Sequence, residues 1–138
     1  MIDVTLVDTN VLLDIFTRDL QWAHWSVTHM DAAALRGDIA INSVIYAELS
    51  VRFPDIETLQ DALGNIGIIM HEIPRAALFL AGKTFERYRR AGGSRTGVLP
   101  DFFIGAHAAV VGATLVTRDV RRYRNYFPKL DLVTPWQS

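Results

Sequence analysis

The chain contains no cysteine among its 138 residues. This absence excludes disulfide frameworks, zinc sites built on thiolates and cysteine nucleophiles, and it is compatible with a reducing compartment. No basic and apolar leader opens the sequence. The longest apolar runs, such as residues 110–116, fall far short of the roughly 20 residues that a membrane-spanning helix needs. We therefore expect a soluble, cytoplasmic protein with no membrane association.

Proline and glycine are also sparse, at 5 and 9 residues, and neither is clustered. This distribution argues against collagen-like and low-complexity chains. Hydrophobic residues make up 50% of the sequence and charged residues 21%, which is typical of a folded globule. A chain of this length fits one compact core, so we expect a single domain over residues 1–138.

The net charge of −1 conceals an uneven distribution along the chain. Residues 1–75 carry 4 Arg and 11 Asp or Glu, whereas residues 76–138 carry 10 Arg or Lys and 4 Asp or Glu. Bunched arginines can form a surface for a polyanion, although solvated helix faces would produce the same pattern. The basic residues of the second part are Lys83, Arg87, Arg89, Arg90, Arg95, Arg118, Arg121, Arg122, Arg124 and Lys129.

Short apolar runs alternate with longer stretches of helical spacing. Brief strands, buried on both faces, are predicted at residues 5–7, 38–41, 67–70, 113–116 and 130–133. Helices are predicted at residues 21–36, 43–51, 55–63, 75–91 and 100–111. Because strands alternating with helices favour a parallel sheet covered on both faces, we expect an α/β protein: a three-layer α/β/α sandwich with a mainly parallel sheet of about five short strands.

Carboxylates stand at the ends of several predicted strands and helices. Asp8 ends the first strand and Asp119 follows the fourth, while Asp101 opens a helix and Glu48 lies on another. Ligands gather at the carboxyl edge of parallel sheets, so these four side chains could form one acidic pocket. Such a pocket requires a cation, and Mg²⁺ or Mn²⁺ prefers oxygen ligands.

Each of these acids also has an ordinary explanation. Asp8, with Thr9 and Asn10, could cap a helix beginning at Val11, and Asp101 behind Pro100 is a common helix start. Asp119 could cap the short helix that follows it, and Glu48 could be a solvated helix residue. No single one of them identifies a site.

Four segments together resemble a known family. VDTNVLLD, AELS, LPDFFIGAHA and LVTRDVRRYRNYFP resemble the PIN-domain ribonucleases, and most closely the VapC-type toxins of toxin-antitoxin pairs. The resemblance covers nearly the whole chain. It implies a PIN-like fold and an Mg²⁺- or Mn²⁺-dependent endoribonuclease whose catalytic acids are Asp8, Glu48, Asp101 and Asp119.

By the same resemblance, Asp8, Asp101 and Asp119 are the metal ligands, and Asn10 and Thr117 support them by hydrogen bonds. Many relatives place a further acid where this chain has Arg122, directly before Tyr123, so two tightly bound ions are not expected in the free protein. Arg118, Arg121 and Arg122 are the candidate contacts to RNA phosphates. The implied partners are RNA, a second copy of the chain and a cognate VapB-type antitoxin.

Two rival interpretations remain open at this stage. A PIN-like module could bind RNA or a protein without cutting, although a pure binder gains nothing from clustered carboxylates that face phosphates. A phosphate-accepting receiver domain also uses acids at strand ends. A receiver would need an acidic partner for Asp8 in its own loop and a suitable late lysine, and the only late lysine is Lys129.

Overall fold

The computed structural model describes residues 3–95 and 97–135. Within these residues, one sheet has five parallel strands in the order β3-β2-β1-β4-β5. The strands are β1 (Asp3–Val7), β2 (Gly37–Ile41), β3 (Ile69–Met70), β4 (Thr114–Val116) and β5 (Leu132–Val133). The first strand of the chain is therefore the central strand of the sheet.

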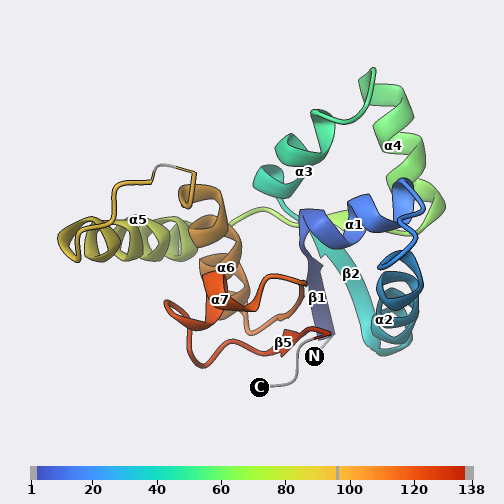
Figure 1. Cartoon of the computed structure of the whole chain (residues 1–138). Helices are drawn as coiled ribbons and strands as arrows, with labels where there is room; N and C mark the ends of the chain where they lie inside the picture. The colour runs from blue at the N-terminus through green and yellow to red at the C-terminus, as the bar shows by residue number, and fades with distance from the viewer. Residues whose placement is uncertain (1–2, 96, 136–138) are drawn as a thin grey trace.

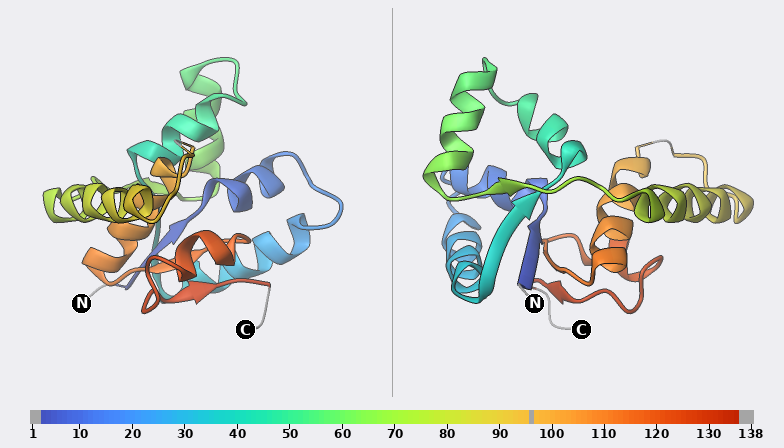
Figure 2. Two further views of the ribbon diagram at one scale, coloured as in Figure 1. Left: turned by 60° about the vertical axis from the view of Figure 1, so that its left-hand side comes forward. Right: turned by 180° about the vertical axis from the view of Figure 1, so that it is seen from behind.

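Helices cover both faces of this sheet, with α2 on one side and α6 on the other (Figures 1 and 2). Helix α5 packs on α6 and extends away from the sheet (Figure 1). The helices are α1 (Thr9–Phe16), α2 (Ala23–Arg36), α3 (Ser43–Ser50), α4 (Ile56–Asn65), α5 (Arg75–Arg90), α6 (Leu99–Val111) and α7 (Val120–Arg124). The layers confirm the predicted α/β/α sandwich with its parallel sheet.

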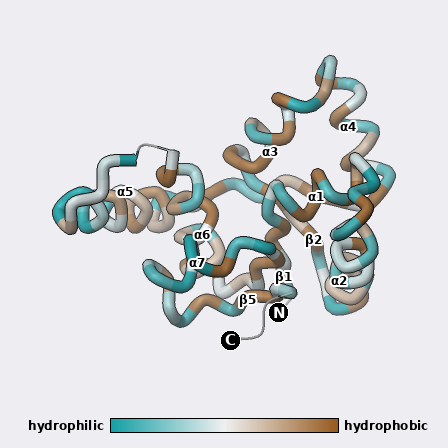
Figure 3. Tube along the Cα trace, viewed as in Figure 1, coloured by the Kyte–Doolittle hydropathy of each residue, from teal (hydrophilic) through white to brown (hydrophobic). Residues whose placement is uncertain are grey.

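The core forms where the central strands meet the helices. Leu6, Val7, Ile41, Leu115 and Val116 are fully buried on neighbouring strands. Hydrophobic segments gather around these strands and along α6, and the far end of α5 is hydrophilic (Figure 3). None of the helices in the described residues combines the length and apolar character that a bilayer span requires.

The predicted strands and helices all occur, and their ends shift by no more than two residues. The prediction that every strand is buried on both faces is wrong for β3, where Ile69 is 42% exposed and Met70 50% exposed. β3 is a two-residue strand at the edge of the sheet, so its residues have a neighbouring strand on one side only.

Side chains at the carboxyl edge start the helices that leave the sheet. The Asn42 side chain accepts a hydrogen bond from the Ile45 N–H at 3.0 Å and caps α3. The Asp8 side chain caps α1 in the same way. At the other end of α6, Gly112 adopts φ 70°, a left-handed conformation that favours glycine, and it turns the chain into β4. These caps fix where the acidic residues stand.

Candidate functional site

Asp8 lies buried at the carboxyl end of β1, where four donors surround its carboxylate. Oδ1 accepts from the Thr9 N–H at 2.8 Å. Oδ2 accepts from the hydroxyls of Thr117 and Tyr123, at 2.8 and 3.0 Å, and from Asn10 Nδ2 at 3.2 Å. Burial raises the pKa of Asp8, and the hydrogen bonds from Thr117, Tyr123 and the Thr9 N–H oppose the rise. Asp8 is thus both a helix cap and the most firmly held acid of the site.

Asp101 is buried in the first turn of α6, and its Oδ2 lies 3.1 Å from Nη1 of Arg122. Burial raises the pKa of Asp101 to about 7, Arg122 opposes the rise, and the carboxylates of Asp8, Glu48 and Asp119 add to it. An acid on one helix therefore senses the charges of acids on three other segments. Arg122 also joins Asp101 to Asp119, since its Nε lies 2.8 Å from Asp119 Oδ2.

Asp119 and Glu48 complete the group. One alternative from the sequence was that Asp119 caps α7, but its carboxylate makes no capping bond to that helix. Its Oδ2 lies 2.8 Å from Nε of Arg122 instead. The Asp119 N–H donates to the Thr117 hydroxyl at 2.9 Å. Glu48 accepts from the Thr9 hydroxyl at 2.7 Å. Thr9 thus connects Asp8 to Glu48 through its N–H and its hydroxyl, and the Thr117 hydroxyl connects Asp8 to the backbone of Asp119.

The chemistry of this group fits a hard divalent cation, because it offers carboxylate oxygens. Burial, and then the neighbouring carboxylates, raise the pKa of Asp101 despite the Arg122 guanidinium beside it. As the side chains lie, no three acids or histidines in residues 3–95 and 97–135 are gathered closely enough to hold an ion together. Asp101 and Asp119 turn toward Arg122 instead.

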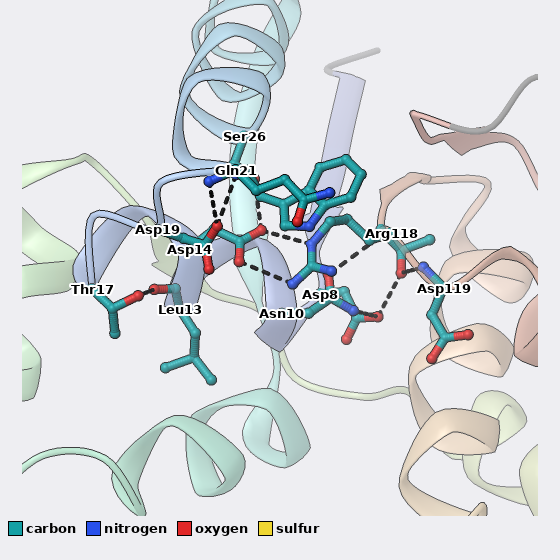
Figure 4. A network of polar contacts seen from close by, with 12 residues as sticks. Asp8, Asn10, Leu13, Asp14, Thr17, Asp19, Gln21, Ser26, Arg118 and Asp119 are labelled. Carbon is teal, nitrogen blue, oxygen red and sulfur yellow. Dashed lines mark hydrogen bonds and ion pairs between the residues drawn. The ribbon is translucent and has the colours of Figure 1, made fainter.

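Arg118 is oriented away from the four acids of the site and toward Asp14 of α1 (Figure 4). Its Nε and Nη2 lie 2.7 and 2.9 Å from the Asp14 carboxylate, and its guanidinium lies 5.0 Å from the centre of the Trp22 ring. Ser26 donates to the same carboxylate at 3.1 Å. The Arg118 N–H also donates to Asn10 Oδ1 at 3.3 Å. A phosphate would have to compete with Asp14 for this arginine, whereas Arg121 is exposed.

Tyr123 and Gly105 support the site, although neither residue was predicted from the sequence to belong to it. Tyr123 is fully buried, so its hydroxyl has a fixed position against Asp8. A Cβ added to Gly105 would lie 2.5 Å from the Phe127 ring and 3.2 Å from the Tyr123 ring. The glycine therefore lets the α7 region approach α6. Tyr123 lies four residues after Asp119 on a short helix, and this spacing was the sequence signal that could have placed it near the site.

Asn42 and His107 join the two helices that carry Glu48 and Asp101. Asn42 Nδ2 lies 3.1 Å from Nδ1 of His107, which is buried, and Asn42 Oδ1 is already used as the cap of α3. Burial lowers the pKa of His107, and the neighbouring His71 lowers it further. The neutral imidazole therefore acts as a packing residue between these helices.

The chain matches solved structures over almost its full length. A chain of VapBC2 from Rickettsia felis, bound to a DNA fragment from their promoter, is 21% identical, with a TM-score of 0.73, over 97% of this chain and 99% of that one. A toxin-antitoxin complex from Klebsiella pneumoniae gives 20% identity and a TM-score of 0.69 over 97% and 99%. A chain of VapBC-1 from nontypeable Haemophilus influenzae is 15% identical, with a TM-score of 0.70, over 95% of this chain and 97% of that one.

These identities establish likeness of fold. A comparison with curated protein sequences finds no significant match. The family model described as PIN domain matches residues 5–128, a span that holds all four acids, both threonines and the basic segment around Asp119. The chain belongs to the PIN domain family.

Proposed function

We propose that this chain is an endoribonuclease that hydrolyses RNA phosphodiester bonds with Mg²⁺ or Mn²⁺. One observation carries the proposal: shared partners link four acids from separate segments at the carboxyl edge of the sheet. Thr9 contacts Asp8 and Glu48, and Arg122 contacts Asp101 and Asp119. The Thr117 hydroxyl connects the two pairs, because it donates to Asp8 and accepts from the Asp119 N–H. Membership of the PIN domain family supports the same function. The four acids are Asp8, Glu48, Asp101 and Asp119.

Asp8, Asp101 and Asp119 would hold the ion in this proposal. When bound, the ion would lower the pKa of a coordinated water and neutralise charge that builds on the phosphate oxygens. Glu48, held by the Thr9 hydroxyl, would orient the attacking water. Asn10 and Thr117 would keep the Asp8 carboxylate in place by the hydrogen bonds described above.

RNA would approach along the basic rim beside Asp119. Arg121 is exposed on α7, so it can reach a phosphate directly. Arg122 could do so after leaving Asp101 and Asp119, and Arg118 after leaving Asp14. Arginines at the rim would offset the repulsion between phosphates and the acids.

We further propose that the chain is the toxin of a VapC-type pair. The structures that it resembles include VapBC proteins and a toxin-antitoxin complex, and those likenesses support a VapB-type antitoxin as its partner. Expression of the chain alone should stop growth, and Asp119→Asn should relieve the arrest. Arrest by both forms would contradict a toxic nuclease activity.

Self-association into a homodimer is part of the same proposal. Exposed apolar side chains support it, such as Phe79 of α5, which is 70% exposed, and the adjacent Leu78. Light scattering on the purified chain should give twice the monomer mass of 15.5 kDa. A monomeric mass at concentrations well above those in the cell would contradict it.

Cleavage of a labelled single-stranded RNA tests the nuclease directly. We expect cutting by the wild type with Mn²⁺ or Mg²⁺, none after chelation, and a loss of at least 100-fold in Asp119→Asn. Asp38→Asn is the matched control, because Asp38 is exposed at the opposite end of the sheet on β2. RNA binding without cleavage under every metal condition would favour the non-catalytic module instead.

A further inference from the structure

Arg122 connects two acids of the proposed metal site. Its Nη1 lies 3.1 Å from Asp101 Oδ2, and its Nε lies 2.8 Å from Asp119 Oδ2. The first contact joins α7 to α6 across 21 positions of sequence, so it is more than an ion pair within one helix. A single guanidinium thus occupies the space between two carboxylates.

The two sides of this contact differ in their access to water. The Arg122 side chain is 57% exposed, whereas the Asp101 side chain is 10% exposed. A guanidinium at such a surface can leave its partners readily, because exposed ion pairs are weak. The Asp101 carboxylate cannot leave, so it must take up another cation or a proton when the arginine departs. This asymmetry makes the arginine the exchangeable member of the pair.

Arginine and a divalent ion use the same oxygens in different ways. The guanidinium approaches through a planar fork of N–H donors, and each carboxylate must face that fork. A Mg²⁺ or Mn²⁺ ion instead needs carboxylate oxygens at close range around one point. The orientation of Asp101 and Asp119 toward Arg122 agrees with the absence of a three-ligand cluster in the described residues.

We propose that Arg122 is a built-in, exchangeable counter-cation of the acidic site: it pairs with Asp101 and Asp119 in the metal-free protein, and a divalent ion must displace it to bind. The inference rests on the metal site of the proposed function. Once displaced, the guanidinium remains at the rim, where a phosphate of the RNA can replace the lost carboxylates. Metal binding thereby prepares the arginine for substrate.

Calorimetric titration of the metal-free chain with Mn²⁺, in about 0.15 M salt, tests this competition. Arg122→Gln should bind Mn²⁺ about three- to tenfold more tightly than the wild type, because no ion pair has to be broken. Arg122→Lys, which keeps the charge without the fork, should have an intermediate affinity. Arg121→Gln removes an equal charge one residue away and should change the affinity less than about twofold.

The outcomes separate this inference from the proposed function. Equal affinity of Arg122→Gln and the wild type, or equal tightening in Arg121→Gln, would overturn the exchange and leave the nuclease proposal standing. Absence of Mn²⁺ binding in the wild type and in every variant, with folding verified by circular dichroism, would overturn the metal site and the exchange together.

Discussion

Replacement of Asp101 by asparagine is expected to stabilise the metal-free protein at neutral and higher pH. Burial raises the pKa of Asp101 from 3.8 to about 7. The Arg122 guanidinium lowers this pKa, and the Asp8 carboxylate raises it further. The folded chain therefore binds this proton more strongly than the unfolded chain does. By linkage, the free energy of unfolding falls as the pH rises from about 4 to about 7. An asparagine has no charge to desolvate, so its variant should lack this loss.

The size of the effect follows from the pKa of Asp101. The interval between 3.8 and about 7 sets an upper limit of roughly 4 kcal/mol, at about 1.4 kcal/mol for each pH unit. The side chain keeps some contact with water and its partner Arg122 is exposed, so solvent screening reduces the effect. We expect Asp101→Asn to gain about 1–2 kcal/mol at pH 8 and little at pH 4.

Urea unfolding at pH 4 and pH 8, with a chelator present, measures this difference. Asp31→Asn is the matched control, because Asp31 is exposed on α2 and lies outside the acidic group. The reasoning is refuted if Asp101→Asn shows the same change in unfolding free energy between the two pH values as the wild type and the control.

Two further predictions concern the residues that support Asp8. Tyr123→Phe removes the hydroxyl that donates to Asp8 and keeps the ring, so it should lower the unfolding free energy by about 1–2 kcal/mol in urea titrations; unchanged stability would mean that the bond contributes nothing. Gly105→Ala should destabilise by roughly 1–3 kcal/mol, because the new Cβ would meet Phe127. Gly64→Ala, on α4 with open space around it, should raise the melting temperature slightly, and an equal loss in both glycine variants would contradict the packing argument.

The sequence predicted the elements well because short apolar runs and helix caps are local signals. The five strands and the main helices occur at the expected places. The burial of β3 was predicted wrongly, because strand order is a tertiary property. The apolar residues Ile69 and Met70 indicate a buried strand, but their strand lies at the edge of the sheet. The outward extension of α5 could not be predicted for the same reason.

The acids of the site could be found from sequence because each follows a strand or lies in a helix near the carboxyl edge. The ion pairs that the site residues make could not be predicted from the sequence. Arg118 was a candidate for RNA, and its pairing with Asp14 depends on how α1 packs against the segment after β4. Likewise, nothing in the local pattern indicates that Arg122 points back to Asp101, 21 positions earlier. Whether the four acids and the arginines act as proposed stays a prediction.

The central position of β1 determines when the site can form during synthesis. β2 can join β1 as soon as residues 3–41 have been synthesised, but β4 pairs with β1 only after residue 116 has followed, and the Thr117 hydroxyl reaches Asp8 across 109 positions. A truncated product that ends before β4 has no Asp119 and no partner hydroxyls for Asp8. Assembly of the four acids therefore requires synthesis to pass β4 and α7, so a product that ends earlier lacks the contacts that hold Asp8 in place.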